Sequence, residues 1–129
     1  MRKFLLVLLL AVVSNSALAG WVRIKNEFVP AYIDTDSVSK DGEIAKLSKL
    51  YDYKAAQMDS HGKLMRSMVI RYEYDCESRS VRTLDLISYS GNMGVGNVLS
   101  EVSNPNVNWH PVNSDDSETK LFKYACLDR

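Results

Sequence analysis

The sequence predicts an α+β domain, in which a curved antiparallel β-sheet carries a C-terminal helix on one face. Two observations support this fold class. Residues 64–76 alternate in polarity with a period of two, which is typical of a strand with one buried face. Residues 114–118 place serine and acidic side chains just before a short apolar stripe, which is typical of the first turn of a helix.

Length and composition limit the classes of protein to consider. The chain has 129 residues, with 16 basic and 16 acidic side chains and no formal net charge. This length favours one domain, and 46% hydrophobic with 25% charged residues is typical of a globular chain rather than a disordered one. A neutral chain lacks the basic surface that nucleic acid requires, so we expect no nucleic-acid partner.

The first nineteen residues have the three parts of a secretory signal peptide. Two basic residues follow Met1, residues 4–13 are apolar, and the segment ends in Ala17-Leu18-Ala19. We expect cleavage after Ala19, since the peptidase requires small side chains at positions −3 and −1. The alternative of a membrane anchor is disfavoured because the apolar run is about half of the ~20 residues needed to span a bilayer.

We expect residues 20–129 to form a single exported domain. Gly20, not a cysteine, directly follows the expected cleavage point, so the exported protein is expected not to be lipidated. No later segment is long and apolar enough to span a membrane. We therefore expect a protein of the periplasm, the cell surface or the medium.

The strands of the sheet are predicted by aromatic and β-branched runs between turn-forming residues. In chain order they cover residues 21–24, 28–33, 43–53, 64–76, 81–89 and 97–102. Pro30 restricts the second strand to a sheet edge or a bulge. Turns are expected at residues 34–37, 57–63 and 90–96, at the hairpin signal Asp41-Gly42, and in a polar loop over residues 103–108.

The strand over residues 64–76 has the clearest two faces. Its apolar face carries Met68, Ile70, Tyr72, Tyr74 and Cys76. Its short connection to residues 81–89 favours an antiparallel hairpin. Five tyrosines fall on predicted strands, at positions 51, 53, 72, 74 and 89. We interpret them as core or sheet-face residues, and an exposed aromatic surface for protein recognition is the alternative.

The C-terminal helix is expected to be fixed to the sheet by a disulfide. Ser114 or Asp115 can cap the helix, and an apolar stripe of Leu121, Phe122 and Ala125 continues to Cys126. Cys76 and Cys126 are the only cysteines, and an even pair in an exported protein predicts a disulfide. Closing a loop of about 50 residues contributes about 4 kcal/mol to stability. A reactive thiol is disfavoured because no base or resolving cysteine lies at short spacing.

No catalytic, cofactor-binding or metal-binding pattern is present, so we expect neither an enzyme nor a cofactor. Residues 94–96 lack the third glycine and the following helix of a dinucleotide-binding loop. His61 and His110 are interpreted as surface residues rather than ligands. The pair Asp115-Asp116 is better explained as a helix cap than as a cation site.

The order and spacing of several short motifs resemble the bacterial surface-adhesin protein E family. These are Trp21, Tyr32-Ile33-Asp34 with Ser37-Val38, Arg66-Ser67 ahead of Tyr74-Asp75-Cys76, Tyr89 with Gly94-x-Gly96, Trp109 with Pro111, and Ala125-Cys126. The resemblance covers essentially residues 20–129. It implies an antiparallel sheet with a disulfide-tied C-terminal helix, binding of host proteins such as vitronectin, laminin or plasminogen, and a capacity to dimerise.

Two hypotheses for function follow. The first is a non-catalytic exported binding protein that resembles surface adhesin E and binds its partner through the strand over residues 64–74 and the preceding turn. Lys63, Arg66 and Arg71 are its candidate partner-binding residues. The alternative is a periplasmic, envelope-associated structural protein of the same fold with no host ligand. It is suggested by the near-neutral charge and the missing lipid-attachment cysteine.

Overall fold

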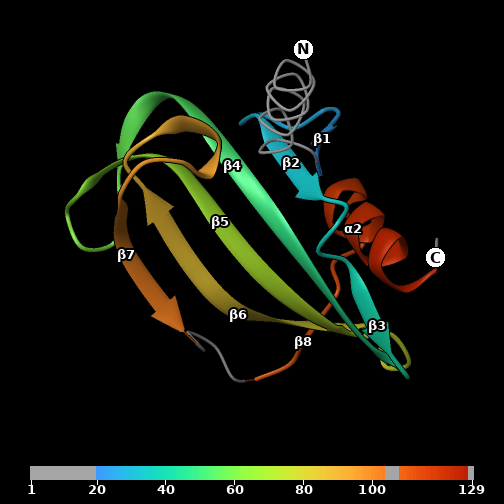
Figure 1. Cartoon of the computed structure of the whole chain (residues 1–129). Helices are drawn as coiled ribbons and strands as arrows, with labels where there is room; N and C mark the ends of the chain where they lie inside the picture. The colour runs from blue at the N-terminus through green and yellow to red at the C-terminus, as the bar shows by residue number, and fades with distance from the viewer. Residues whose placement is uncertain (1–19, 104–107, 128–129) are drawn as a thin grey trace, which may run out of the picture.

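The computed structural model describes residues 20–103 and 108–127, and within them one open, curved antiparallel sheet carries a C-terminal helix (Figure 1). The sheet has eight strands in the order β1-β2-β4-β5-β6-β7, with β3 paired to β4 and β8 paired to β6. This confirms the predicted fold class. The predicted signal peptide, residues 1–19, and residues 104–107 of the predicted polar loop lie outside the described residues.

The strands differ greatly in length, and three long ones form the centre of the sheet. The elements are β1 (Trp21–Ile24), β2 (Ala31–Asp34), β3 (Ser39–Asp41), β4 (Ile44–Met58), β5 (Leu64–Asp75), β6 (Ser80–Tyr89), the 3-10 helix η2 (Asn92–Gly94), β7 (Val98–Ser103), β8 (His110–Pro111) and the helix α2 (Asp116–Cys126). β4, β5 and β6 lie side by side and run the length of the molecule (Figure 1).

Two predicted strands have clearly different bounds in the structure, and two further strands were not predicted. β2 begins at Ala31, after Pro30, because proline has no N–H to donate to a neighbouring strand. The Pro30 carbonyl nevertheless accepts a hydrogen bond from the Asp52 amide at 2.8 Å. β4 continues to Met58, five residues past the predicted end, because a bulge between Asp52 and Gln57 restores its pairing with β5. The short strands β3 and β8 were not predicted.

The helix α2 packs on one face of the sheet, as predicted. Asp115 caps it, and its carboxylate accepts a hydrogen bond from the Glu118 amide at 3.0 Å. Phe122 is 2% exposed and meets the ring of Tyr74 edge-on, with 6.0 Å between ring centroids. The predicted disulfide between Cys76 and Cys126 is present and joins the last turn of α2 to the residue after β5.

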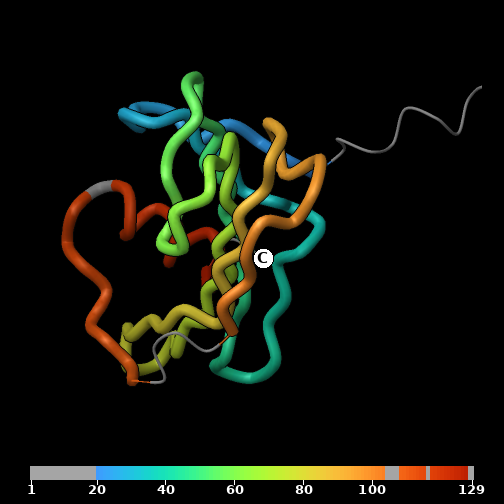
Figure 2. The backbone as a smooth tube through the Cα atoms, turned by 90° about the vertical axis from the view of Figure 1, so that its left-hand side faces the viewer, coloured from blue at the N-terminus to red at the C-terminus, as the bar shows by residue number. Residues whose placement is uncertain are grey.

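The loop between β6 and β7 covers the opposite face of the sheet. Leu47 packs in the core beneath α2, whereas Leu50, three positions along β4 and therefore on the other face, lies beneath Gly94. The Ser67 hydroxyl donates to the Gly91 carbonyl at 2.6 Å and accepts from the Gly94 amide at 2.9 Å. Figure 2 shows this orange loop on one side of the strands and the orange-red segment leading to α2 on the other.

A buried polar network connects the β1–β2 loop, the sheet and the helix. The Lys49 ammonium donates to the Glu27 carboxylate at 3.0 Å and to the Tyr51 hydroxyl at 2.8 Å. The Ser117 hydroxyl in α2 donates to the same carboxylate at 3.1 Å. Burial by itself lowers the pKa of Lys49, but its bonds to Tyr51 and Glu27 outweigh burial and raise that pKa above its ordinary value.

Candidate binding site

The end of the β4–β5 hairpin folds across the sheet and is fixed there by one carboxylate. Asp59 Oδ2 accepts hydrogen bonds from the hydroxyls of Ser88 on β6 and Ser100 on β7, at 2.9 and 2.7 Å. Asp59 Oδ1 accepts from the backbone amides of His61 and Lys63, at 2.8 and 2.9 Å. These four donors, the Lys63 amide foremost, hold the pKa of Asp59 well below its ordinary value.

The three predicted binding residues fall in two places. Lys63 and Arg66 lie at this hairpin end, where the Lys63 ammonium donates to the Leu99 carbonyl at 2.8 Å. Arg66 is exposed, and its guanidinium has no partner among the described residues. Arg71 is five positions further along β5, hence on the opposite face, and it forms an ion pair with Asp85 at 2.7 Å. The structure thus brings Lys63 and Arg66 together and separates Arg71 from them.

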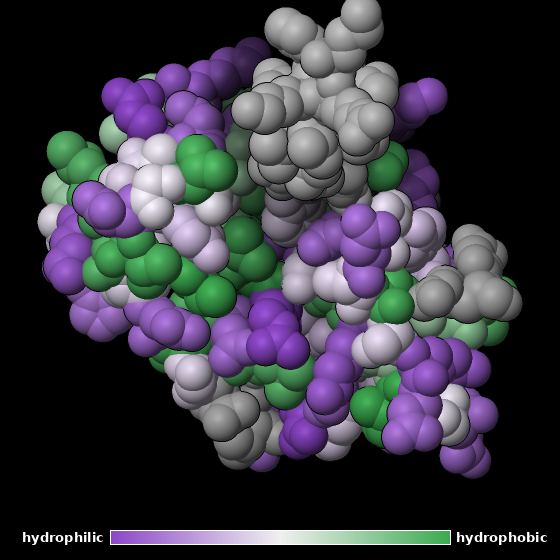
Figure 3. Space-filling view, in the orientation of Figure 1, coloured by the Kyte–Doolittle hydropathy of each residue, from purple (hydrophilic) through white to green (hydrophobic). Residues whose placement is uncertain are grey.

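Two apolar side chains at the hairpin end were missed by sequence reasoning. Met58 and Leu64 are directly paired across β4 and β5, and they are 64% and 62% exposed. The one sequence signal for Leu64 was its position as the first residue of the predicted strand, next to the predicted turn over residues 57–63. Apolar surface, green in Figure 3, gathers on the left of the molecule over the ends of β4, β5 and β7. We refer to residues 58–66 as the hairpin end.

A small apolar cavity lies beneath the hairpin end. Its volume is about 180 Å³, and it is lined by Met58, Asp59, Ser60, Met65, Met68, Leu86, Ser88, Ser100 and Val102. This is below the range of about 300–1,000 Å³ that is usual for small-molecule sites. The Asp59 bonds to Ser88 and Ser100 lie at its polar side and hold the turn over it.

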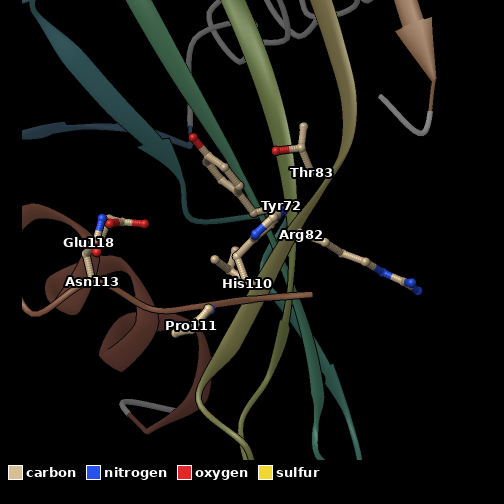
Figure 4. Close-up of a pocket in the computed structure, with 8 residues that line it drawn as sticks. Tyr72, Arg82, Thr83, His110, Pro111, Asn113 and Glu118 are labelled. Atoms are coloured by element: carbon tan, nitrogen blue, oxygen red, sulfur yellow. The ribbon is translucent and has the colours of Figure 1, made fainter. Parts of the chain in front are cut away.

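A larger polar pocket lies near the opposite end of β5, between the sheet, β8 and the helix. Its volume is about 440 Å³, and it is lined by Tyr72, Val81, Arg82, Thr83, His110, Pro111, Asn113 and Glu118. We refer to it as the sheet–helix pocket. Figure 4 shows Glu118 and Asn113 together on the helix side, while Arg82 extends away from them. Burial raises the pKa of the Tyr72 hydroxyl, and the Glu118 carboxylate contributes to the rise.

The structure also locates the two histidines, the helix-cap aspartate and the strand tyrosines that were considered in the sequence. His61 is exposed in the β4–β5 turn, and His110 lies on β8 opposite Val81. Asp115 caps α2, which confirms its interpretation as a helix cap. All five strand tyrosines are at least partly buried, and Tyr74 is 3% exposed. Within residues 20–103 and 108–127, no three His, Cys, Asp or Glu side chains are grouped to hold a metal ion.

Comparison with known proteins identifies the family. The sequence matches the family described as surface-adhesin protein E over residues 21–127. This places it among surface adhesin-like proteins, a class that points to a non-enzymatic role and to an exported or surface location. The chain belongs to the surface-adhesin protein E family. No curated protein gives a significant match to the sequence.

Solved structures of Haemophilus influenzae protein E have the same fold. The crystal structure of protein E from the non-typeable bacterium is 18% identical, with a TM-score of 0.60, over 81% of this chain and 74% of that one. Crystal form II is 15% identical with a TM-score of 0.63, over 84% of this chain and 87% of that one. A selenomethionine form is 15% identical with a TM-score of 0.64, over 85% and 88%. Across the described residues, no helix is both long and apolar enough to cross a membrane.

Proposed function

We propose that this protein is a non-catalytic, exported binding protein whose hairpin end contacts a protein partner outside the cytoplasm. The observation that carries the proposal is the pair of exposed apolar side chains, Met58 and Leu64, near the Arg66 guanidinium, which has no partner among the described residues. Protein interfaces typically combine an apolar centre with arginine, and a few such residues supply most of the binding energy. Membership of an adhesin family supports this role.

The chemistry of the hairpin end defines the partner it would fit. An apolar patch flanked by Lys63 and Arg66 favours a segment that carries both apolar and acidic side chains. Host extracellular or plasma proteins, such as vitronectin, laminin or plasminogen, are the partner class that we propose to test first. Arg71 keeps a proposed role only on the opposite face, where a partner would compete with Asp85.

The rigid attachment of the hairpin end supports the proposal in a second way. Asp59 receives four hydrogen bonds and the Lys63 ammonium is held by the Leu99 carbonyl. A surface that is already ordered loses less conformational entropy when a partner binds. Arg66 and Leu64 are thereby presented from a fixed backbone.

The test of the site is a charge reversal. The variant Arg66→Glu removes a cation that supports nothing else among the described residues, and Lys40→Glu, at an exposed position on β3, is the matched control. Binding of the exported protein to immobilised vitronectin, laminin and plasminogen is measured for each. We expect Arg66→Glu to weaken binding by about tenfold or more. Equal affinities for wild type, Arg66→Glu and Lys40→Glu would refute the site.

The location is tested separately on intact cells. External protease is added and the domain is followed with an antibody to residues 20–129. Digestion in intact cells supports the proposed surface role. Protection until the outer membrane is opened contradicts it and points to the periplasm. Mass spectrometry of the purified protein, with Gly20 expected as the first residue, tests the proposed cleavage after Ala19.

A further inference from the structure

We propose that the sheet–helix pocket binds a primary ammonium group on a short alkyl stem, as carried by a lysine side chain of a partner protein. This inference goes beyond the proposed role of the hairpin end and does not depend on it. Tyr72, in the pocket, is eight positions from Leu64 along β5, which is about 25 Å in an extended strand. The two sites are therefore separate surfaces.

The charge of the pocket favours a cation. The Glu118 carboxylate lines the pocket and accepts no hydrogen bond from any described residue, although its backbone amide is bonded to Asp115. Its effect on the pKa of the Tyr72 hydroxyl is consistent with its position beside that group. Ammonium groups pair with carboxylates through charge-assisted hydrogen bonds, which are among the strongest in proteins.

The one arginine of the pocket does not cancel this charge. The guanidinium of Arg82 is already paired with the Glu73 carboxylate at 2.7 Å. It also stacks over the ring of Trp109, at 4.4 Å from the ring centroid. Figure 4 shows its side chain extending away from Glu118, Asn113 and His110. Among the described residues that line the pocket, the Glu118 carboxylate is therefore not matched by a cation.

The remaining groups suit the rest of such a ligand. Hydroxyls from Tyr72 and Thr83 and the amide of Asn113 supply further hydrogen-bond acceptors for the three N–H donors of an ammonium group. Val81 and Pro111 supply apolar wall for a methylene stem. The volume of about 440 Å³ falls within the usual range for ligand sites and is ample for a single side chain.

The probe is Nα-acetyl-lysine methylamide, which keeps its side-chain ammonium group. It is titrated into the isotope-labelled exported protein and followed by NMR. The matched probe is N-acetyl-norleucine methylamide, which has the same alkyl stem and no ammonium group. We expect the lysine probe to shift the amide signals of Thr83, His110 and Glu118, and to bind about tenfold or more tightly than norleucine. Equal shifts from both probes, or lysine shifts confined to other surfaces, would overturn the proposal.

Two variants assign the binding to the pocket. Glu118→Gln removes the charge with little change of shape and should weaken the lysine probe by about tenfold. Glu101→Gln, at an exposed position on β7, is the matched control and should leave the affinity unchanged. Thr83→Val removes one hydroxyl at constant volume and should weaken binding several-fold. Unchanged affinity in both Glu118→Gln and Thr83→Val would refute the assignment.

The source of the ammonium group is decided by two further probes. Butylamine that binds as tightly as the lysine probe supports the ammonium site and identifies free alkylamines as its ligands. Tighter binding of the lysine probe supports a protein partner. A neutral monosaccharide that shifts the same signals more strongly than either amine would overturn the proposal in favour of carbohydrate. The Arg66→Glu variant, measured with the host proteins, tests only the hairpin end, and the lysine probe tests only the sheet–helix pocket. Failure of one site is therefore distinguishable from failure of the other.

Discussion

The carboxylate of Asp59, in the turn after β4, accepts a hydrogen bond from the hydroxyl of Ser88 on β6 at 2.9 Å. β5 lies between these two strands in the sheet, so this bond crosses the central strand and holds the hairpin end over its neighbours. A side chain at a hairpin turn thereby determines the position of the surface that we propose for binding. Four predictions test this and related contacts.

Replacement of Asp59 should loosen the hairpin end without unfolding the domain. Asp59→Asn leaves one acceptor oxygen where the carboxylate has two, so at least one pair of the hydrogen bonds from Ser88, Ser100, His61 and Lys63 is lost. We expect hydrogen exchange of residues 58–66 to become several-fold faster, with exchange in β6 unchanged. Asp52→Asn, which affects the β6–β7 loop instead, is the control. Unchanged exchange at the hairpin end would contradict the role of Asp59.

The same contact should make the hairpin end sensitive to acid. The folded-state pKa of Asp59 lies below the unfolded value of about 3.8, so its stabilisation is complete above that pH and is lost as the pH falls below it. The NMR shifts of the His61 and Lys63 amides should therefore stay constant from about pH 7 to about pH 4 and change below it. Asp59→Asn should remove that change. A midpoint near or above pH 5 in the wild type would contradict the prediction.

Removal of the disulfide should be among the most destabilising changes in the chain. The double variant Cys76→Ala with Cys126→Ala releases a loop with a sequence separation of 50 residues. We expect the free energy of unfolding to fall by about 4 kcal/mol, measured by urea denaturation. Wild-type protein unfolded in the presence of a reductant is the control and should lose a similar amount. A loss below about 1 kcal/mol would show that packing of α2 alone holds the helix.

The buried ion pair should respond differently to single and double substitution. The side chains of Lys49 and Glu27 are 5% and 17% exposed, so Glu27→Gln leaves an uncompensated buried ammonium and should cost about 3 kcal/mol in urea denaturation. Adding Lys49→Met to that variant should recover part of the loss. Arg71→Gln, in an ion pair whose arginine is 48% exposed, is the control and should cost below about 1 kcal/mol. Equal costs for the two pairs would contradict the prediction.

Local chemistry predicted most of the sheet and the start of the helix. Alternation located β5, the Asp41-Gly42 signal located the turn between β3 and β4, and the acidic segment at Asp115 located the start of α2. The far end of β4 was not predicted, because its return to pairing depends on a bulge opposite β5. β8 has only two residues and owes its conformation to pairing with β6, so its own sequence carries too little signal.

The candidate sites were predicted only where they follow from strand periodicity. Lys63 and Arg66 were proposed from the sequence as binding residues, but the fold-back that presents them depends on hydrogen bonds that Asp59 accepts from Ser88 and Ser100, which lie 29 and 41 positions away. In the sequence, Glu118 was only one of the acidic residues that predicted the first turn of the helix, and no binding role was assigned to it. Its place in a pocket depends on strands and loops distant in sequence, which no periodicity within the helix reports.

The disulfide lies at the end of β5 opposite the hairpin end, and this affects how the fold withstands mechanical load. A partner held at Leu64 and pulled along β5 would draw the strand against Cys76, which is covalently joined to α2. β5 is paired to β4 on one side and β6 on the other along most of its length. The pull therefore acts in shear on many hydrogen bonds at once, rather than peeling them apart one after another.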